Sequence, residues 1–122
     1  MVITADTVVI IENEILGKPK DRDEAIRMIN LLSGKVHKVV TGVTVHTKDK
    51  TRTFSVTSKV TFEKLDNQEV EYYVDNYKPY DKAGAYGVQE WIGYCGVSNV
   101  EGSYFNVMGL PTQKLYKVLK DF

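Results

Sequence analysis

The chain alternates between apolar, β-branched stretches and segments whose apolar residues have a helical spacing. Residues 2–11 are apolar almost without interruption, which is typical of a strand buried on both faces of a sheet. Apolar and polar residues alternate in 36–47 and 51–62, and a polar turn at 48–50 separates these two segments. The pattern predicts a long antiparallel hairpin, and 96–100 has the composition of a further short strand.

Capping residues mark two helices in the sequence. Asp21 is followed three positions later by Glu24, and Gly34 stands where a helix beginning here would end. Asp66 and Glu69 repeat the pattern and predict a second helix that ends near Asn76. The residues expected to face the core from these helices are Ala25, Met28, Ile29, Leu32, Val70, Tyr73 and Val74.

The end of the chain carries a third helical pattern. Pro111 suits the start of a helix whose Leu115, Val118 and Leu119 are directed inward. The glycine-rich segment 83–87 is expected to be irregular. Together these elements predict an α/β fold in one domain over 1–122, with a mixed twisted sheet, a long antiparallel hairpin and flanking helices.

Composition limits the classes of partner. With 122 residues and 43% hydrophobic content, the chain can form one core without a disulfide or a structural metal. Sixteen basic residues balance sixteen acidic ones, so we expect no nucleic-acid partner and no membrane-surface partner. The uncharged runs are too short to span a bilayer, and a cytoplasmic location is the default expectation.

The cysteine and the histidines give no clear sign of a reactive centre. Cys95 is the single cysteine, which excludes a disulfide within the chain and is compatible with a reducing compartment. No histidine lies near it in sequence, so a packed or tolerated thiol is favoured over a nucleophile. His37 and His46 share a predicted strand without zinc-ligand spacing, and both are expected on its surface.

Asp6 is the acidic residue that interrupts the first apolar strand. An ionised carboxylate in such a run is costly unless it lies at the mouth of the strand or is paired. At that position it can activate water or hold a metal, because ligands in open α/β sheets gather beyond strand ends. The alternative is an acid in a turn or cap, satisfied by main-chain N–H groups.

Two further residues and one segment are candidates for contacts with a ligand. Lys18 lies between Gly17 and Pro19 and suits a phosphate, although a solvated loop lysine is the plainer interpretation. Small residues in 82–87 leave main-chain groups accessible to a ligand, or they reflect a closely packed loop. Gln89 offers a paired donor and acceptor for the edge of a base.

Four segments together resemble the Maf family of nucleoside triphosphate pyrophosphatases. They are Ala5-Asp6-Thr7-Val8-Val9, Gly17-Lys18-Pro19, 81–89 and 101–111. The resemblance covers the whole chain, which is similar to the C-terminal two-thirds of a Maf protein, and it implies a Maf/inosine triphosphatase-like fold. Within the family, Ala5-Asp6-Thr7 resembles the subgroup that hydrolyses dTTP and UTP to the monophosphate and pyrophosphate.

The resemblance also implies roles for individual residues. Asp6 matches the family's proton acceptor, Thr7 and Gln89 match positions tied to the choice of base, and Lys18 matches a lysine of the phosphate site. A divalent cation, Mg²⁺ or Mn²⁺, is implied as cofactor, and a homodimer is expected. With the chemistry of phosphate cleavage, the resemblance also suggests Lys82 as a second counter-charge for phosphates, and Asp6, Asp81 and Glu101 as candidate metal ligands.

One family feature has no counterpart in the sequence. Maf proteins open with a strand and a Ser-x-Ser-Pro-Arg-Arg loop that holds the triphosphate. The arginines here are Arg22, Arg27 and Arg52, and none is followed by another arginine. This difference predicts a fragment or a homologue truncated at the N-terminus. It also keeps open two alternatives to an enzyme, a non-catalytic nucleotide-binding module and a self-associating module.

Overall fold

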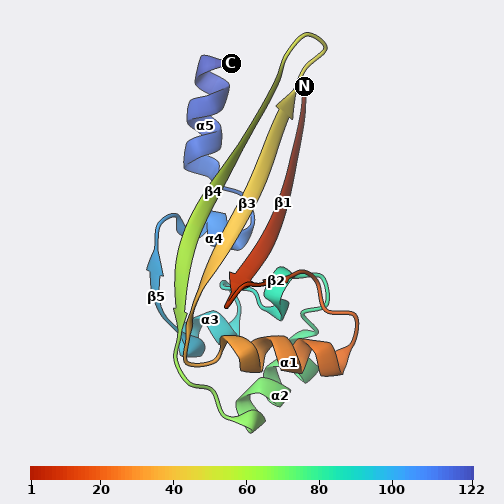
Figure 1. Cartoon of the computed structure of the whole chain (residues 1–122), viewed down its shortest axis with the longest axis vertical. Helices are drawn as coiled ribbons and strands as arrows, with labels where there is room; N and C mark the ends of the chain where they lie inside the picture. The colour runs from red at the N-terminus through yellow and green to blue at the C-terminus, as the bar shows by residue number, and fades with distance from the viewer.

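The structure is a computed structural model that describes all residues from 1 to 122, and its centre is a five-stranded antiparallel sheet (Figure 1). The strand order is β2-β1-β3-β4-β5, and each neighbouring pair is antiparallel. The expected mixed sheet with a hairpin is therefore an entirely antiparallel one. The strands are β1 (Val2–Ile11), β2 (Glu14–Leu16), β3 (Val36–His46), β4 (Thr51–Phe62) and β5 (Val97–Glu101).

The predicted hairpin is confirmed as the backbone of the sheet. β3 and β4 pair along their whole length, from Val36 opposite Thr61 to His46 opposite Thr51. At the turn, the Thr47 N–H donates to the Lys50 carbonyl over 2.8 Å, and the Lys50 N–H donates to Thr47 Oγ1 over 3.1 Å. These bonds close the polar turn that the sequence indicates.

The expectation of a doubly buried first strand is wrong. β1 pairs with β3 from Val2 to Ile10, but on its other side β2 covers only Val9 to Ile11. The edge of β1 from Val2 to Val8 is therefore open, and residues 1–6 are exposed. The β-branched run reflects strand propensity, which favours a pleated backbone whether or not both faces are covered.

The three predicted helices are confirmed. In α1 (Arg22–Leu32) the Asp21 side chain accepts from the Glu24 N–H, and α2 (Asn67–Tyr77) begins with a complete capping box of Asp66 and Glu69. α5 (Thr112–Asp121) follows Pro111 and buries Leu115 and Val118. The short elements η1 (Ala83–Ala85), α3 (Trp91–Gly96) and α4 (Tyr104–Met108) are additional to the prediction.

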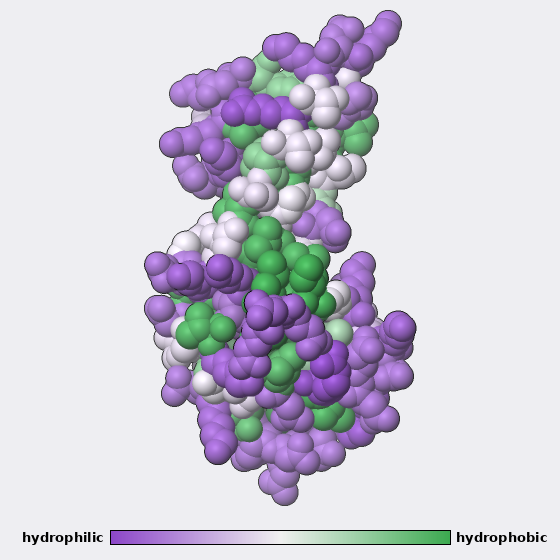
Figure 2. Space-filling view, in the orientation of Figure 1, coloured by the Kyte–Doolittle hydropathy of each residue, from purple (hydrophilic) through white to green (hydrophobic).

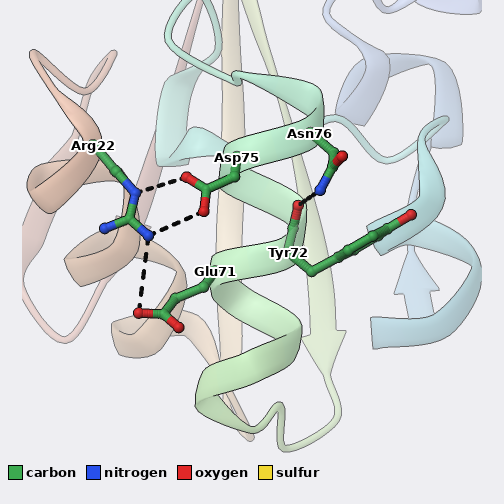
Figure 3. A network of polar contacts seen from close by, with 5 residues as sticks. All are labelled: Arg22, Glu71, Tyr72, Asp75 and Asn76. Atoms are coloured by element: carbon green, nitrogen blue, oxygen red, sulfur yellow. Dashed lines mark hydrogen bonds and ion pairs between the residues drawn. The ribbon is translucent and has the colours of Figure 1, made fainter.

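Arg22 links the two long helices at the base of the molecule (Figure 3). Its guanidinium donates two hydrogen bonds to the Asp75 carboxylate, at 2.7 Å and 3.1 Å, and lies 3.9 Å from Glu71. All three side chains are close to half exposed. The ion pairs therefore fix the relative orientation of α1 and α2 more than they stabilise the fold.

The apolar core has two parts on one face of the sheet. The larger part lies between β1, β3 and β4 and the helices α1, α2 and α3, and the smaller one joins Val43 and Val45 of β3 to α5. Since Val39, Val43 and Val45 alternate along β3, both parts lie on the same face. Figure 2 shows that the molecule narrows between its two ends, with apolar side chains gathered at and below the narrowing.

His37 is buried rather than on the strand surface, whereas His46 is exposed as expected. His37 Nε2 lies 2.6 Å from the Tyr86 hydroxyl, and the imidazole packs edge-on against the rings of Phe62 and Tyr86. Burial lowers the pKa of His37 to about 4. The strand alternation that places Val39 inward also places His37 inward.

Stability is expected to fall by about 3 kcal/mol as the pH is lowered from 6.5 to 4, because of His37. Between these pH values the unfolded chain binds a proton on His37 and the folded chain does not. Above and below this range, His37 has the same protonation in both states. Urea unfolding at pH 7 and pH 4.5 measures the effect. The free energy of unfolding should depend less on pH in His37→Gln and as much as before in His46→Gln. An equal pH dependence in the unmodified chain and both variants would show that His37 is not the cause.

None of the helices combines the length with the apolar composition that a membrane-crossing helix requires.

Candidate functional site

A cavity of about 240 Å³ brings distant parts of the chain together. Its wall is formed by β1, by the loop after β2, by the segment 81–89 and by the end of α4. Six of the residues that sequence analysis singles out line it: Asp6, Thr7, Lys18, Asp81, Lys82 and Gln89.

Asp6 lies within β1 and not at the mouth of the strand, which corrects the expected position. Its register partner on β3 is Gly42, where an added Cβ would meet no atom within 4 Å. Side chains alternate along a strand, so those of Asp6 and Thr7 point to opposite faces. Val9 and its register partner Val39 also line the cavity and lie on the face of Thr7, so Asp6 borders the cavity from the other face of β1.

The Asp6 carboxylate is free to meet a ligand. Asp6 is exposed, and none of the ion pairs of the chain involves it. Four carboxylates accept hydrogen bonds from main-chain N–H groups, and Asp6 is not one of them: they are those of Asp21, Glu24, Asp66 and Glu69. The interpretation of Asp6 as a turn or cap acid satisfied by main-chain N–H groups is therefore wrong.

The two lysines of the cavity differ in their pairing. Lys82 Nζ lies 3.1 Å from Asp81 Oδ1 and 3.9 Å from Glu90 Oε1. The hydrogen bond from Lys82, followed by its charge, holds the pKa of Asp81 below its usual range, and Lys18 adds to the effect. Lys18 itself is exposed and forms no ion pair, so its charge is available to an anionic ligand.

A buried phenol supports the segment that carries Lys82. The Tyr73 hydroxyl donates to Glu90 Oε1 over 2.7 Å and accepts from the Gly87 N–H over 3.0 Å. Burial, and after it the bond to Glu90, raises the pKa of Tyr73, so the hydroxyl keeps its proton at neutral pH. Sequence analysis placed Tyr73 in the core and missed Glu90, because no local pattern links residues so far apart.

The cavity also has less polar lining residues. Tyr86 lines it with only 6% of its surface exposed, and Val107 and Met108 of α4 add apolar atoms. Thr7 Oγ1 lies 2.9 Å from Thr41 Oγ1, and Gln89 stays exposed. An aromatic wall with a hydroxyl and an amide at its border is suited to a flat, polar-edged ring.

Glu101 lies apart from the other candidates. It ends β5 opposite Lys59, at the far edge of the sheet from β1, and it does not line the cavity. No group of three or more His, Cys, Asp and Glu side chains is close enough to share a metal ion. Asp6 and Asp81 are the acidic residues that line the cavity.

Cys95 shows no sign of a nucleophile. Cys95 is exposed on α3, and partial burial of its thiol, followed by the charge of Glu69, raises the pKa of the thiol. Reactive thiols have a lowered pKa. The thiol is therefore tolerated at this surface.

Comparison with known sequences gives one consistent result. The profile of the family described as "Maf-like protein" matches residues 1–122. Proteins named dTTP/UTP pyrophosphatase are similar along the chain: that of Porphyromonas gingivalis W83 is 59% identical over 122 residues, and that of Parabacteroides distasonis is 57% identical over 122 residues. The Flavobacterium psychrophilum protein of the same name is 52% identical over 119 residues.

These relatives are longer than the chain. The matches cover 100%, 100% and 98% of this chain but only 61%, 63% and 61% of the three relatives. The chain thus spans about three fifths of their length.

Proposed function

The chain belongs to the Maf family, and on that premise we propose that it acts in a nucleoside triphosphate pyrophosphatase that hydrolyses dTTP and UTP to the monophosphate and pyrophosphate. The observation that carries the proposal is the unpaired Asp6 in one cavity with the unpaired Lys18 and with Thr7 and Gln89. The names of the relatives support this choice of substrates.

Asp6 is proposed as the proton acceptor. A water oxygen attacks the α-phosphorus, its proton passes to an Asp6 oxygen, and the bond from the α-phosphorus to the α–β bridging oxygen breaks. Pyrophosphate leaves with the electron pair of that bond. Lys18 and Lys82 are positioned in the same cavity to offset the negative charge that the phosphates carry.

Thr7, Gln89 and the Tyr86 ring are proposed to bind the pyrimidine. The Gln89 amide can donate to one base atom and accept from the next, which matches the edge of uracil or thymine. The volume of about 240 Å³ is that of a small pocket. Its apolar atoms from Tyr86, Val107 and Met108 give a flat base a surface to pack against.

A divalent cation, Mg²⁺ or Mn²⁺, is the proposed cofactor. Carboxylate oxygens suit these ions, and Mg²⁺ is usually held by one or two carboxylates together with substrate phosphates. Asp6 and Asp81 both line the cavity, so carboxylate residues of the right type are present, although Asp81 Oδ1 is paired with Lys82 in the structure. The bound ion would supply positive charge to the phosphates. Glu101 lies outside the cavity and is not included.

The proposal is tested with the 122-residue chain, UTP, dTTP and Mg²⁺, with GTP as the non-cognate nucleotide. The expected products from UTP are UMP and pyrophosphate in equal amounts, while GTP reacts much more slowly. Release of orthophosphate in place of pyrophosphate would contradict the reaction. Calorimetric binding of UTP without turnover would favour the alternative, a non-catalytic nucleotide-binding module.

Gly87→Ala is expected to weaken UTP binding about tenfold while the free energy of unfolding changes by less than about 1 kcal/mol. An added Cβ would lie 2.7 Å from Glu90 Oε1 and 2.8 Å from Lys82 Cε. The Lys82 side chain can rotate away, which moves its ammonium group, while Glu90 Oε1 must shift against its hydrogen bond from the Tyr73 hydroxyl.

Calorimetry with UTP and urea unfolding separate the two effects of this substitution. Gly17→Ala is the matched control, because a Cβ there meets no atom within 4 Å. Its Kd should stay near that of the unmodified chain. An unchanged Kd in Gly87→Ala would remove Lys82 from the phosphate site.

We also infer a homodimer and a cytoplasmic location. The open edge of β1 from Val2 to Val8 offers unpaired main-chain groups and the exposed side chains of Val2 and Ile3, features that favour pairing with another strand. Light scattering should give twice the chain mass, and a strict monomer at high concentration would contradict the dimer. The exposed free thiol of Cys95 supports a reducing compartment.

A further inference from the structure

A buried chain of hydrogen bonds connects the cavity to α4, and the proposed reaction does not use it. Thr41, Ser58 and Asn106 are polar residues with at most 1% of their surface exposed. Thr41 Oγ1 lies 2.9 Å from Thr7 Oγ1 at the cavity wall and donates to the Asn106 carbonyl oxygen over 3.4 Å. The Asn106 carbonyl also accepts from the Gly109 N–H over 3.0 Å.

The Asn106 side chain holds this carbonyl in place. Its Nδ2 lies 3.2 Å from the Val39 carbonyl oxygen, 3.0 Å from that of Val56 and 3.0 Å from Ser58 Oγ. The Asn106 N–H donates to Ser103 Oγ over 3.1 Å at the start of α4. Side chain and main chain of Asn106 thus tie α4 to β3 and β4 at one fixed position.

The number of protons links the directions of these two hydrogen bonds, of which the Thr7–Thr41 contact alone would allow either donor. A threonine hydroxyl has one proton, and a carbonyl oxygen can only accept. When Thr41 donates to the Asn106 carbonyl, the proton between Thr7 and Thr41 must come from Thr7. The Thr7 hydroxyl then turns only lone pairs toward the cavity.

We propose that Thr41 is a positioning residue that makes Thr7 a hydrogen-bond acceptor for an N–H group of the bound base. This inference rests on the proposed function and deepens it. Uracil and thymine carry an N–H at the ring nitrogen between their two carbonyl groups, whereas cytosine has an acceptor at that nitrogen. An acceptor at Thr7 therefore favours the first two bases.

The test uses Thr41→Val, which keeps the shape of the side chain and removes the hydroxyl. The Thr7 proton is then released from Thr41 and can point to an acceptor on the base. We expect the ratio of the Kd for CTP to the Kd for UTP to fall about tenfold. Calorimetry on the 122-residue chain with both nucleotides measures this ratio.

Thr41→Ser is the matched variant, because it restores the hydroxyl and with it the ratio of the unmodified chain. Circular dichroism and urea unfolding check that each variant is folded. An unchanged ratio in folded Thr41→Val, or an equal shift in Thr41→Ser, overturns the role of Thr41 and leaves the proposed function intact. Failure of the unmodified chain to bind UTP overturns the proposed function and this inference with it.

Discussion

Asp6→Asn is expected to lower the rate of pyrophosphate release from UTP by about 1000-fold. Asparagine matches aspartate in size and keeps one acceptor oxygen, but its amide cannot take a proton from water at neutral pH. Asp6 forms no ion pair in the chain, so the substitution should not disturb folding. A coupled pyrophosphate assay gives the rate, and urea unfolding gives the stability.

Asp49→Asn is the matched control for this loss of a carboxylate. Asp49 lies in the exposed turn between β3 and β4 and does not line the cavity. The turnover of Asp49→Asn should equal that of the unmodified chain. Asp6→Asn with unchanged turnover would show that another group accepts the proton, and the assignment of Asp6 would be wrong.

The parts of the fold that follow from the sequence are those set by local patterns. Asp66 and Glu69 are three positions apart, and each satisfies an N–H at the start of α2, so four consecutive residues specify the helix start. The alternation in β3 and β4 likewise gives their burial directly, and it places His37 inward although a histidine was expected on the strand surface. Such signals need no knowledge of distant residues.

The short elements depend on tertiary contacts and escape sequence analysis. α3 and α4 have six and five residues, too few for a helical spacing of apolar positions to show. α4 is placed instead by Asn106, whose side chain bonds to Val39, Val56 and Ser58 on two strands. The exposure of β1 depends in the same way on which strands lie beside it, which its own residues do not specify.

The residues of the candidate site also fall into those that the sequence indicates and those that only the structure reveals. Resemblance nominates Asp6, Thr7, Lys18 and Gln89, and the structure places them around one cavity. The chemistry of phosphate cleavage nominates Glu101 as well, but the strand order puts β5 at the far edge of the sheet. Residues that act through others, such as Glu90 beside Lys82 and Thr41 beside Thr7, need coordinates to be found.

Gly93→Ala is expected to lower the free energy of unfolding by about 4 kcal/mol. A Cβ at Gly93 would lie 1.7 Å from the Val88 carbonyl oxygen and 2.6 Å from its carbonyl carbon. These are main-chain atoms next to Gln89, so no rotation of a side chain can relieve the overlap. Either α3 moves away from the segment 81–89 or Val88 is displaced together with the cavity wall.

Gly96→Ala gives the matched comparison within the same helix. A Cβ at Gly96 would make contacts of 3.4 Å and longer with Leu65 and Ile92, which is ordinary packing. Urea unfolding should therefore separate the two variants by about 3 kcal/mol, and UTP binding should be lost only in Gly93→Ala. Equal stabilities would contradict the close approach of α3 to Val88, and would leave the hydrogen bonds of Tyr73 to Gly87 and Glu90 as the support of this segment.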